Sequence, residues 1–328
     1  MIEALQGWLF ETVLQPLLFR FGWMEVAEDV FDLSEWIVLG AIEVAVLAVV
    51  LTLVERWRPV EPVGDRQAIR VDVVYTLLHR LGLFAFIAFA LVTPVIDWLE
   101  GHARLAGLSR PNLDQLIPGV TDLPLVSFLL YLVVLDLADY WIHRGQHRLG
   151  WWWALHALHH SQRQMTFWSD SRNHLLDDLL RDFLLATLAL LIGVAPEQFV
   201  LLTIVFRVLQ SVQHANLRLR FPGLLERLVV SPSFHRLHHA IGYGHEGAAR
   251  GCNFAVLFSW WDTLFGTADW RPGFVPTGIR DQLDGRDYGH GFWSQQWRGL
   301  GRLGAAIAGR PVADAAQRRD RPDLVGPT

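Results

Sequence analysis

The sequence predicts an all-helical integral membrane protein with about four transmembrane helices in two hairpins. A helical cap on the cytoplasmic side is expected to carry a cluster of histidines. Three observations predict this class. Hydrophobic residues make up 52% of the 328-residue chain and charged residues only 19%, with fifteen tryptophans, which is too apolar for a typical soluble domain. Several apolar runs approach the roughly 20 residues that a bilayer requires. Eleven of the fourteen histidines fall between residues 143 and 245.

Composition also excludes several classes of protein. The formal charge of -5 gives no support for nucleic-acid binding, which needs a basic face. Cys252 is the only cysteine, so a disulfide framework, a thiolate zinc site and an iron–sulfur cluster are excluded. All 28 basic residues are arginines, which indicates a GC-rich, bacterial coding source and hence a bacterial cytoplasmic membrane. The N-terminus carries Glu3 and no arginine before its first apolar run, unlike a cleaved signal peptide.

The first part of the chain is expected to contain an interfacial segment and one hairpin. Residues 4–23 are apolar but include charged side chains, and residues 1–35 are interpreted as an interfacial segment rather than a span. Residues 36–54 form the first transmembrane candidate, with Glu43 as its only charge. Four arginines follow between residues 56 and 70, so the positive-inside rule places this loop in the cytoplasm. A second span is expected at about 81–98.

The second part is expected to return the chain twice to the cytoplasmic side. A third span runs from about residue 123 to 142. The apolar runs 183–194 and 199–209 are separated by residues 195–198, which include Pro196 and Glu197. One continuous helix would hold that charge near mid-bilayer at a cost of about 2.5–3.5 kcal/mol, and Pro would remove a helix hydrogen bond. A hairpin that turns at 195–198 avoids both, with short arms that are tilted, extended or partly inserted. It also leaves the early and late histidines facing each other.

The histidines recur at helical spacing. Because each residue of an α-helix advances about 100°, positions i, i+3 and i+4 share one face. An i, i+4 pair is followed by two HxxHH triplets, and one further histidine follows the hairpin. The predicted metal-binding residues are His143, His147, His156, His159, His160, His214, His235, His238 and His239. So many imidazoles exceed the three or four protein ligands of one zinc ion and fit two ions. Imidazole suits iron, copper, zinc and nickel, and the spacing leaves the metal open.

Other polar residues are candidates for supporting roles. Asp136 and Asp139 precede His143 by seven and four residues on one helical stripe, where a carboxylate can accept the second N–H of a metal-bound imidazole. Gln210 lies one turn before His214 and could hold a metal-bound water. The aromatic run 151–153 (WWW) is interpreted as an interfacial belt.

The remaining histidines are interpreted without a metal. His79, His102 and His290 are expected to be polar anchors near the membrane surface, and His245 is expected to be part of a loop.

With these motifs in place, the chain resembles the fatty acid hydroxylase superfamily, also called the sterol desaturase family. DLADYWIHRGQH (136–147) is similar to its aspartate–aromatic–HRxxH element, and WWWALHALHHS (151–161) to its W-x-x-H-x-x-H-H-S element. SRNHLLD (171–177) is similar to R-x-H-P-x-E, but Leu175 replaces proline and Asp177 replaces glutamate. QHANL (213–217), SPSFHRLHHA (231–240) and NFAVLFSWWDTLFGT (253–267) complete the order, so the resemblance covers about residues 120–268.

The resemblance implies a histidine-rich di-iron oxidase that uses O2 and two electrons to hydroxylate or desaturate an apolar, lipid-like substrate. It implies that the nine histidines bind two irons, for which zinc can substitute, while His174 is either a ligand or an outer-shell group. Residues 36–268 then form the catalytic domain, and residues 269–328 form a polar, partly disordered tail. No dinucleotide-binding motif is present in the sequence, so electrons are expected from a separate cytochrome b5-like or ferredoxin-type partner. The alternative is a non-catalytic membrane metal- or haem-binding protein.

Overall fold

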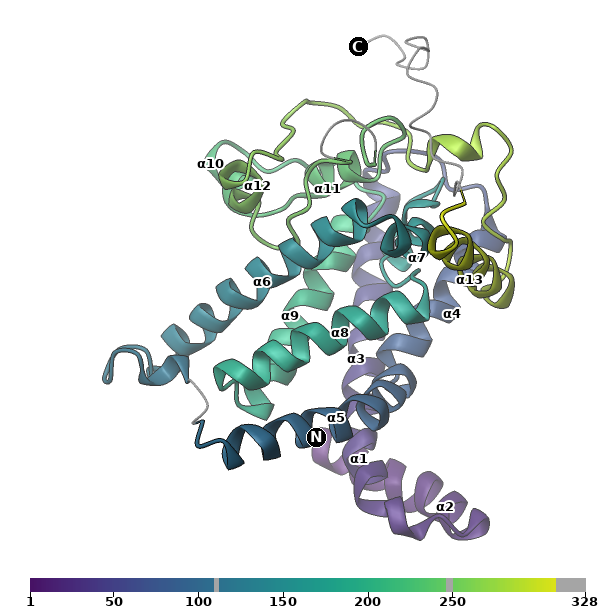
Figure 1. The fold of residues 1–328 in the computed structure, drawn as a ribbon. Coiled ribbons are helices and arrows are strands. Elements are labelled where there is room, and N and C mark those ends of the chain that lie inside the picture. The colour runs from purple at the N-terminus through teal and green to yellow at the C-terminus, as the bar shows by residue number, and fades with distance from the viewer. Residues whose placement is uncertain (109–111, 246–249, 311–328) are drawn as a thin grey trace.

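The structure, a computed structural model, describes residues 1–108, 112–245 and 250–310, and all the regular elements in these ranges are helices joined by loops (Figure 1). Within them no β-strand occurs, and the only bridge joins Ala240 to Thr277. The long helices are α3 (Ala27–Trp57), α4 (Arg66–Arg80), α5 (Leu83–Leu105), α6 (Pro124–Arg148), α8 (Leu175–Ile192) and α9 (Pro196–His214). Residues 311–328, the last part of the predicted tail 269–328, lie outside the described residues.

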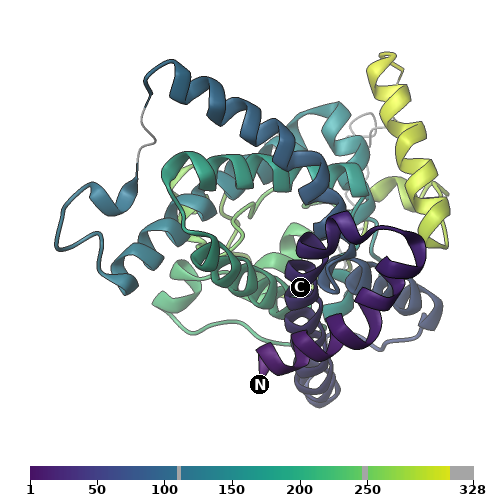
Figure 2. The same ribbon diagram turned by 90° about the horizontal axis from the view of Figure 1, so that it is seen from below.

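Shorter elements cover the two ends of this bundle. At one end lie α1 (Ile2–Leu9), the π-helix η1 (Phe10–Leu14) and α2 (Gln15–Phe21), followed by η2 (Met24–Val26). At the other end lie α10 (Leu224–Leu228), α11 (Pro232–His238) and α12 (Trp260–Leu264), which together are called the cap (Figures 1 and 2). The remaining elements are η3 (Leu113–Gln115), α7 (Gly150–His160), η4 (Phe167–Ser169), η5 (Arg280–Gln282) and α13 (Phe292–Ile307).

Two of the described helices are long and apolar enough to cross a membrane. They are the helical stretch Met24–Trp57, which contains the predicted span 36–54, and Pro124–Arg148, which contains all but the first residue of the predicted span 123–142. The predicted span 81–98 is helical within α5, which includes Pro94. The prediction of helices is therefore confirmed, whereas four complete spans are not.

The predicted helical hairpin is present, but its turn lies earlier than expected. Helix α8 ends at Gly193, whose φ of 86° closes the helix in the left-handed conformation, and α9 begins at Pro196. Pro is favoured in the first turn of a helix because the N–H that it lacks has no partner there. Pro196 and Glu197 thus start α9 instead of forming the turn.

Two contacts join α3 to α4. Gly40 packs directly against the last turn of α4, where a Cβ atom would lie 1.6 Å from the carbonyl oxygen of Arg80. The buried Arg80 guanidinium pairs with Glu43 and donates to Asp170 Oδ2 at 2.8 Å and to Ser211 Oγ at 2.7 Å. The charge predicted within the first span is therefore neutralised by an arginine, and the pair ties α3 and α4 to the segment that leads to the histidines.

Candidate metal centre

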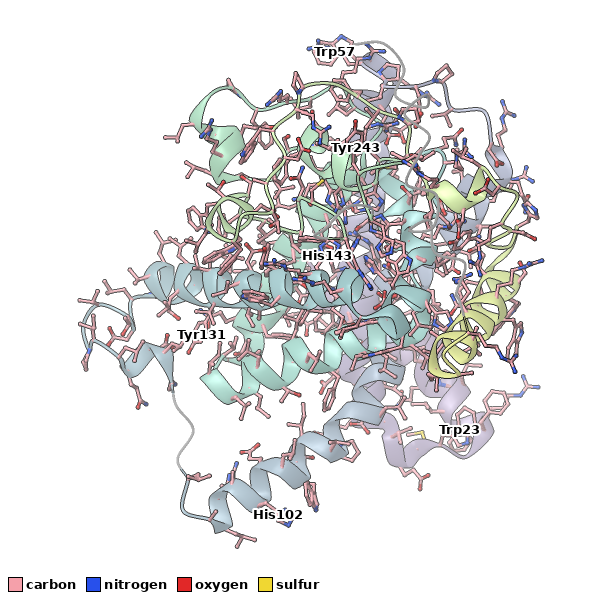
Figure 3. All side chains as sticks on the ribbon, turned by 45° about the horizontal axis from the view of Figure 1, so that its top comes forward. Trp23, Trp57, His102, Tyr131, His143 and Tyr243 are labelled. Carbon is pink, nitrogen blue, oxygen red and sulfur yellow. The ribbon has the colours of Figure 1, made fainter. Side chains whose placement is uncertain are left out.

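All nine histidines that the sequence singles out converge at the cap end of the bundle and form two groups. His143, His147, His156, His160 and His238 make up the first group, and His159, His214, His235 and His239 make up the second. Within each group the candidate ligand nitrogens all lie within 4.8 Å of one another, and every one of these residues is buried. Figure 3 shows the nitrogen-rich side chains gathered around His143 where the helices meet the cap.

Four helix ends supply these side chains. The end of α6 carries the pair His143 and His147, and the end of α9 carries His214. Helix α7 carries the first triplet, and α11 with its C-cap residue carries the second. The triplets occupy one face of each short helix, as the i, i+3, i+4 spacing requires. In α7 this spacing also divides the triplet, because His159 belongs to the second group whereas His156 and His160 belong to the first.

Hydrogen bonds orient three imidazoles of the first group. His143 Nδ1 lies 2.7 Å from the Phe254 carbonyl, and His238 Nδ1 lies 2.7 Å from the Cys252 carbonyl. A carbonyl only accepts, so each Nδ1 carries the proton and each Nε2 presents a lone pair. His156 Nδ1 is held in the same way by the Asp177 carboxylate at 2.9 Å.

Several nitrogens of the first group have no hydrogen-bond partner in the described part of the chain. They are both ring nitrogens of His147 and the Nε2 atoms of His156, His160 and His238. A buried polar atom without a partner costs about 1–3 kcal/mol. A bound metal ion would remove this cost, because a set of converging imidazole lone pairs is a donor set that suits a transition-metal ion.

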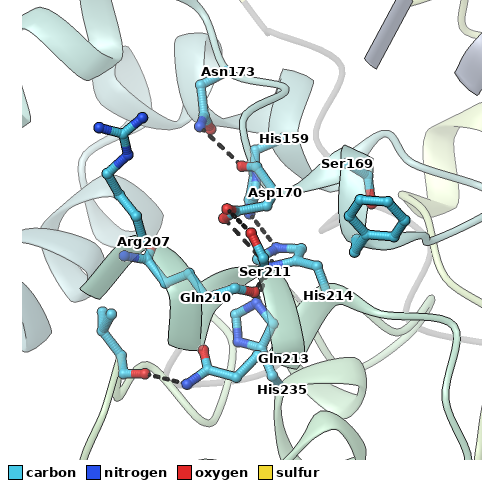
Figure 4. Close-up of polar contacts among 12 residues, drawn as sticks. His159, Ser169, Asp170, Asn173, Arg207, Gln210, Ser211, Gln213, His214 and His235 are labelled. Atoms are coloured by element: carbon cyan, nitrogen blue, oxygen red, sulfur yellow. Dashed lines mark hydrogen bonds and ion pairs between the residues drawn. The ribbon is translucent and has the colours of Figure 1, made fainter. Parts of the chain in front are cut away.

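In the second group, ring nitrogens of neighbouring histidines face one another directly (Figure 4). His214 Nε2 lies 3.1 Å from His159 Nε2 and 3.1 Å from His235 Nε2, and His235 Nε2 lies 3.1 Å from His239 Nε2. His214 Nδ1 donates to the Gln210 carbonyl at 2.9 Å, so its Nε2 has no proton to share with two facing nitrogens. Two nitrogens that each lie ~2.1 Å from one ion are about 3.0–3.4 Å apart, which matches this spacing.

Burial keeps four of these imidazoles neutral. It lowers the pKa of His238 to about 3, and it lowers the pKa values of His159, His160 and His239 well below the usual range, with a further contribution from neighbouring imidazoles. A neutral ring retains the lone pair that binds a metal, whereas a protonated ring does not. Near neutral pH the site therefore offers ligands without prior loss of protons.

Asp136 and Asp139 do not orient His143, which corrects the expectation drawn from their spacing. Asp136 accepts from the backbone N–H groups of Leu257 and Phe258 and from Trp261 Nε1. Asp139 forms a bidentate salt bridge with Arg181. The reason is competition between partners: His143 Nδ1 is bonded to the Phe254 carbonyl, and both carboxylates are bonded to donors from segments distant in sequence. Both carboxylates instead fix neighbouring segments against α6.

His174 and Gln210 also have other roles than those considered from sequence. His174 caps α8 by accepting from Leu176 N, and its Nε2 lies 3.0 Å from the Gln296 carbonyl, so it lies outside both groups. Gln210 contributes its backbone carbonyl to His214, while its side-chain Nε2 donates to the Phe206 carbonyl.

The tryptophan run does not form an exposed belt. Trp152 and Trp153 are buried, and only Trp151 is exposed. Trp152 Nε1 donates to Asp177, and Trp153 stacks on His245 with ring centroids 3.5 Å apart. The expectation of a belt is wrong because helix α7 turns two of its three indoles toward the centre of the protein.

Sequence reasoning missed two carboxylates next to the histidines. Asp177 accepts from Gln146, Trp152 and His156, and Asp170 Oδ1 lies 3.6 Å from His214 Nδ1 (Figure 4). Each group therefore has one carboxylate beside one of its imidazoles. The position of Asp177 three residues after His174, within the altered R-x-H-P-x-E element, was the available signal.

Comparisons with known proteins agree with this geometry. The family model for fatty acid hydroxylase matches residues 128–267, a range that contains all nine histidines. The chain is 26% identical over 222 residues to an ornithine lipid hydroxylase of Rhizobium tropici, covering 66% of this chain and 63% of that protein. It is 30% identical over 132 residues to an alkylglycerol monooxygenase of Danio rerio, covering 40% and 28%.

A third relative is a Delta(7)-sterol 5(6)-desaturase of Gibberella zeae, 27% identical over 179 residues, with 53% of this chain and 52% of the relative covered. The chain thus spans less than two thirds of the length of each of these three proteins. No solved structure matches the chain significantly.

Proposed function

Since the chain belongs to the fatty acid hydroxylase superfamily, we propose that it is a membrane-bound, non-haem di-iron oxygenase that hydroxylates or desaturates an apolar, lipid-like substrate. The observation that carries the proposal is the convergence of nine buried imidazoles in two adjacent groups. The relatives named above, a lipid hydroxylase, an alkylglycerol monooxygenase and a sterol desaturase, suggest a lipid or sterol as the substrate.

In this proposal each group of histidines holds one iron, five imidazoles on the first and four on the second. Two bound irons would supply the reaction of O2 with an unactivated C–H bond. In a hydroxylation, one C–H bond, one O2, two electrons and two protons would be consumed, and one alcohol and one water would be formed. The electrons would come from a separate cytochrome b5-like or ferredoxin-type partner.

The protein's own contribution is to hold neutral imidazoles in fixed orientations away from water. The Phe254 and Cys252 carbonyls and the Asp177 carboxylate fix three rings by their Nδ1 atoms. Hydrogen bonds of this kind set the tautomer and raise the basicity of a ligand. The alternative, a haem protein, would need axial nitrogens on opposite faces of a macrocycle, and the close convergence of the Nε2 atoms in the second group disfavours it.

Metal content and product formation test the proposal together. Protein made with sufficient iron should contain about two metal ions per chain, as measured by elemental mass spectrometry. Zinc is expected as a substitute after overexpression. Membranes that contain it should oxidise one member of a panel of ornithine lipids, alkylglycerols and sterols, and ¹⁸O2 should label the product of a hydroxylation but not an alkene. One metal per chain, or one haem per chain, would contradict the di-iron assignment.

Asp177→Asn tests the carboxylate that the sequence did not reveal. The substitution keeps the side-chain shape but removes the charge that faces His156, and such outer-sphere changes cost about 10–100-fold in metal affinity. We expect the variant to lose metal to a chelator at correspondingly lower concentrations. Asp122→Asn, at an exposed carboxylate in the loop before α6, is the control. Equal metal retention in the two variants would exclude a role for Asp177 in supporting the site.

For the orientation in the membrane, we propose that the histidines face the cytoplasm. The arginine-rich loop 56–70 and the cap would share that side, and the α8–α9 turn would point away from it. Gly64→Cys, Leu224→Cys and Glu197→Cys, each exposed and placed in a Cys252→Ser background, allow labelling with a membrane-impermeant thiol reagent. Positions 64 and 224 should react from the cytoplasmic side only. Labelling of these two positions from opposite sides would refute the arrangement.

A further inference from the structure

Helix α13, which the sequence did not predict, faces the protein with its polar side. Gln295, Gln296 and Arg302 are only 2%, 6% and 5% exposed. Gln296 alone makes four inward contacts. Its Oε1 accepts from Leu175 N at 3.0 Å, and its Nε2 donates to Tyr75 Oη at 2.9 Å and to the Asn173 carbonyl at 3.2 Å. Its own carbonyl accepts from His174 Nε2 at 3.0 Å.

Two further contacts seat α13 on the helices of the metal centre. Arg302 Nε donates to the Ala154 carbonyl of α7 at 2.9 Å. Gly299 allows the helix to approach His174, because a Cβ atom there would lie 2.2 Å from His174 Cδ2. The position of α13 is thus fixed against α7 and against the start of α8.

The opposite side of α13 presents an apolar stripe to the surroundings. Trp293, Trp297, Leu300 and Ile307 recur at helical spacing and are 68%, 67%, 37% and 73% exposed. A helix on the surface of a soluble domain buries its apolar face and exposes its polar one. In α13 this arrangement is inverted, so the stripe is suited to a non-aqueous neighbour and not to water.

The direction of α13 indicates which neighbour this is. Helix α3, a candidate span, is seen lengthwise in Figure 1 and end-on in Figure 2, whereas α13 is seen nearly end-on in Figure 1 and lengthwise in Figure 2. Helix α13 therefore runs across the direction of α3 and not along it. If α3 crosses the bilayer, α13 lies parallel to the membrane plane, which is the orientation of an interfacial helix.

We propose that α13 is an interfacial helix whose stripe (Trp293, Trp297, Leu300 and Ile307) rests in the boundary between headgroups and acyl chains. Tryptophan favours this boundary because its ring is apolar and its N–H is polar. The polar face of the same helix holds α7 and the first turn of α8. Contact with the bilayer therefore sets the depth at which α7 and its histidines lie relative to the lipid.

The other exposed sector of α13 provides a matched comparison. Ser294, Arg298 and Gly301 are exposed but lie off the stripe, and Arg298 Nη2 pairs with Asp287 at 2.7 Å. Bilayer contact should distinguish the two sectors, although both are exposed in the isolated chain.

Spin labels test this difference in the full-length protein. Trp293→Cys, Trp297→Cys and Leu300→Cys on the stripe, and Ser294→Cys, Arg298→Cys and Gly301→Cys beside it, are made in a Cys252→Ser background. Each variant is labelled and placed in nanodiscs of phosphatidylcholine and phosphatidylglycerol. Relaxation by O2, which concentrates in lipid, is compared with relaxation by a water-soluble nickel chelate.

We expect the stripe positions to be several-fold more accessible to O2 than to the nickel chelate, with the reverse at positions 294, 298 and 301. Free access of the nickel chelate to the stripe in nanodiscs would overturn the proposal. So would protection from both reagents together with dipolar broadening between labels, because a second copy of the chain would then cover the stripe. Neither readout depends on activity, so the result is independent of the proposed oxygenase function.

Discussion

His238→Ala is expected to abolish product formation and to reduce the metal content from about two ions per chain to about one. His238 is fully buried at the centre of the second triplet, and the Cys252 carbonyl fixes its Nδ1 so that Nε2 points into the first group. Removal of the ring leaves a gap among neutral imidazoles that are themselves fixed.

His159→Ala should have the corresponding effect on the second group, where His159 Nε2 lies 3.1 Å from His214 Nε2. His290→Ala is the control, because the His290 side chain is 94% exposed and remote from both groups. Metal per chain and product formation are measured for all three variants. If His238→Ala retained two metals and full turnover, the assignment of the first group as a metal site would be wrong.

Gly40→Ala is expected to destabilise the protein by about 3 kcal/mol, the upper range for an overpacked core, because the added carbon meets backbone and not a mobile side chain. The Cβ atom would lie 1.6 Å from the Arg80 carbonyl oxygen, so α3 and α4 would have to separate. That movement would also disturb the Arg80 guanidinium, which bonds to Asp170 and Ser211 near the second group.

Thermal unfolding in detergent, followed by size-exclusion chromatography after heating, measures this effect. Gly7→Ala is the control, because Gly7 is also helical and a Cβ atom there would meet nothing within 4 Å. Alanine is the better helix former by up to about 1 kcal/mol, so the control should unfold at the same or a slightly higher temperature. Equal unfolding temperatures for the two variants would show that α3 and α4 do not pack as closely as described.

The helices and the histidines could be predicted because both depend on local periodicity. Apolar runs of span length lie within α3 and α6, and the HxxHH spacing places each triplet on one helical face. The hairpin of α8 and α9 followed from the cost of a charge and a proline inside a span. These arguments need only the chemistry of neighbouring residues.

The partners of the carboxylates could not be predicted, because they depend on segments distant in sequence. Asp139 pairs with Arg181 of α8, and Asp136 accepts from the backbone after residue 256, while sequence spacing suggested His143 for both. The apolar stripe of α13 was missed for a related reason. Glycine and arginine dominate the composition near the C-terminus, and the helical arrangement of Trp293 and Trp297 was hidden among them.

The anchoring of the first group by Phe254 and Cys252 has a consequence for biosynthesis. The ribosome delivers α6 and α7, with four of the five histidines, well before it delivers His238 and the two carbonyls that fix His143 and His238. A nascent chain that has inserted its spans therefore still lacks an ordered set of donors. If the two groups bind metal as proposed, the first group is complete only after the last third of the chain has folded back onto the earlier helices, so metal loading would be a late step in maturation.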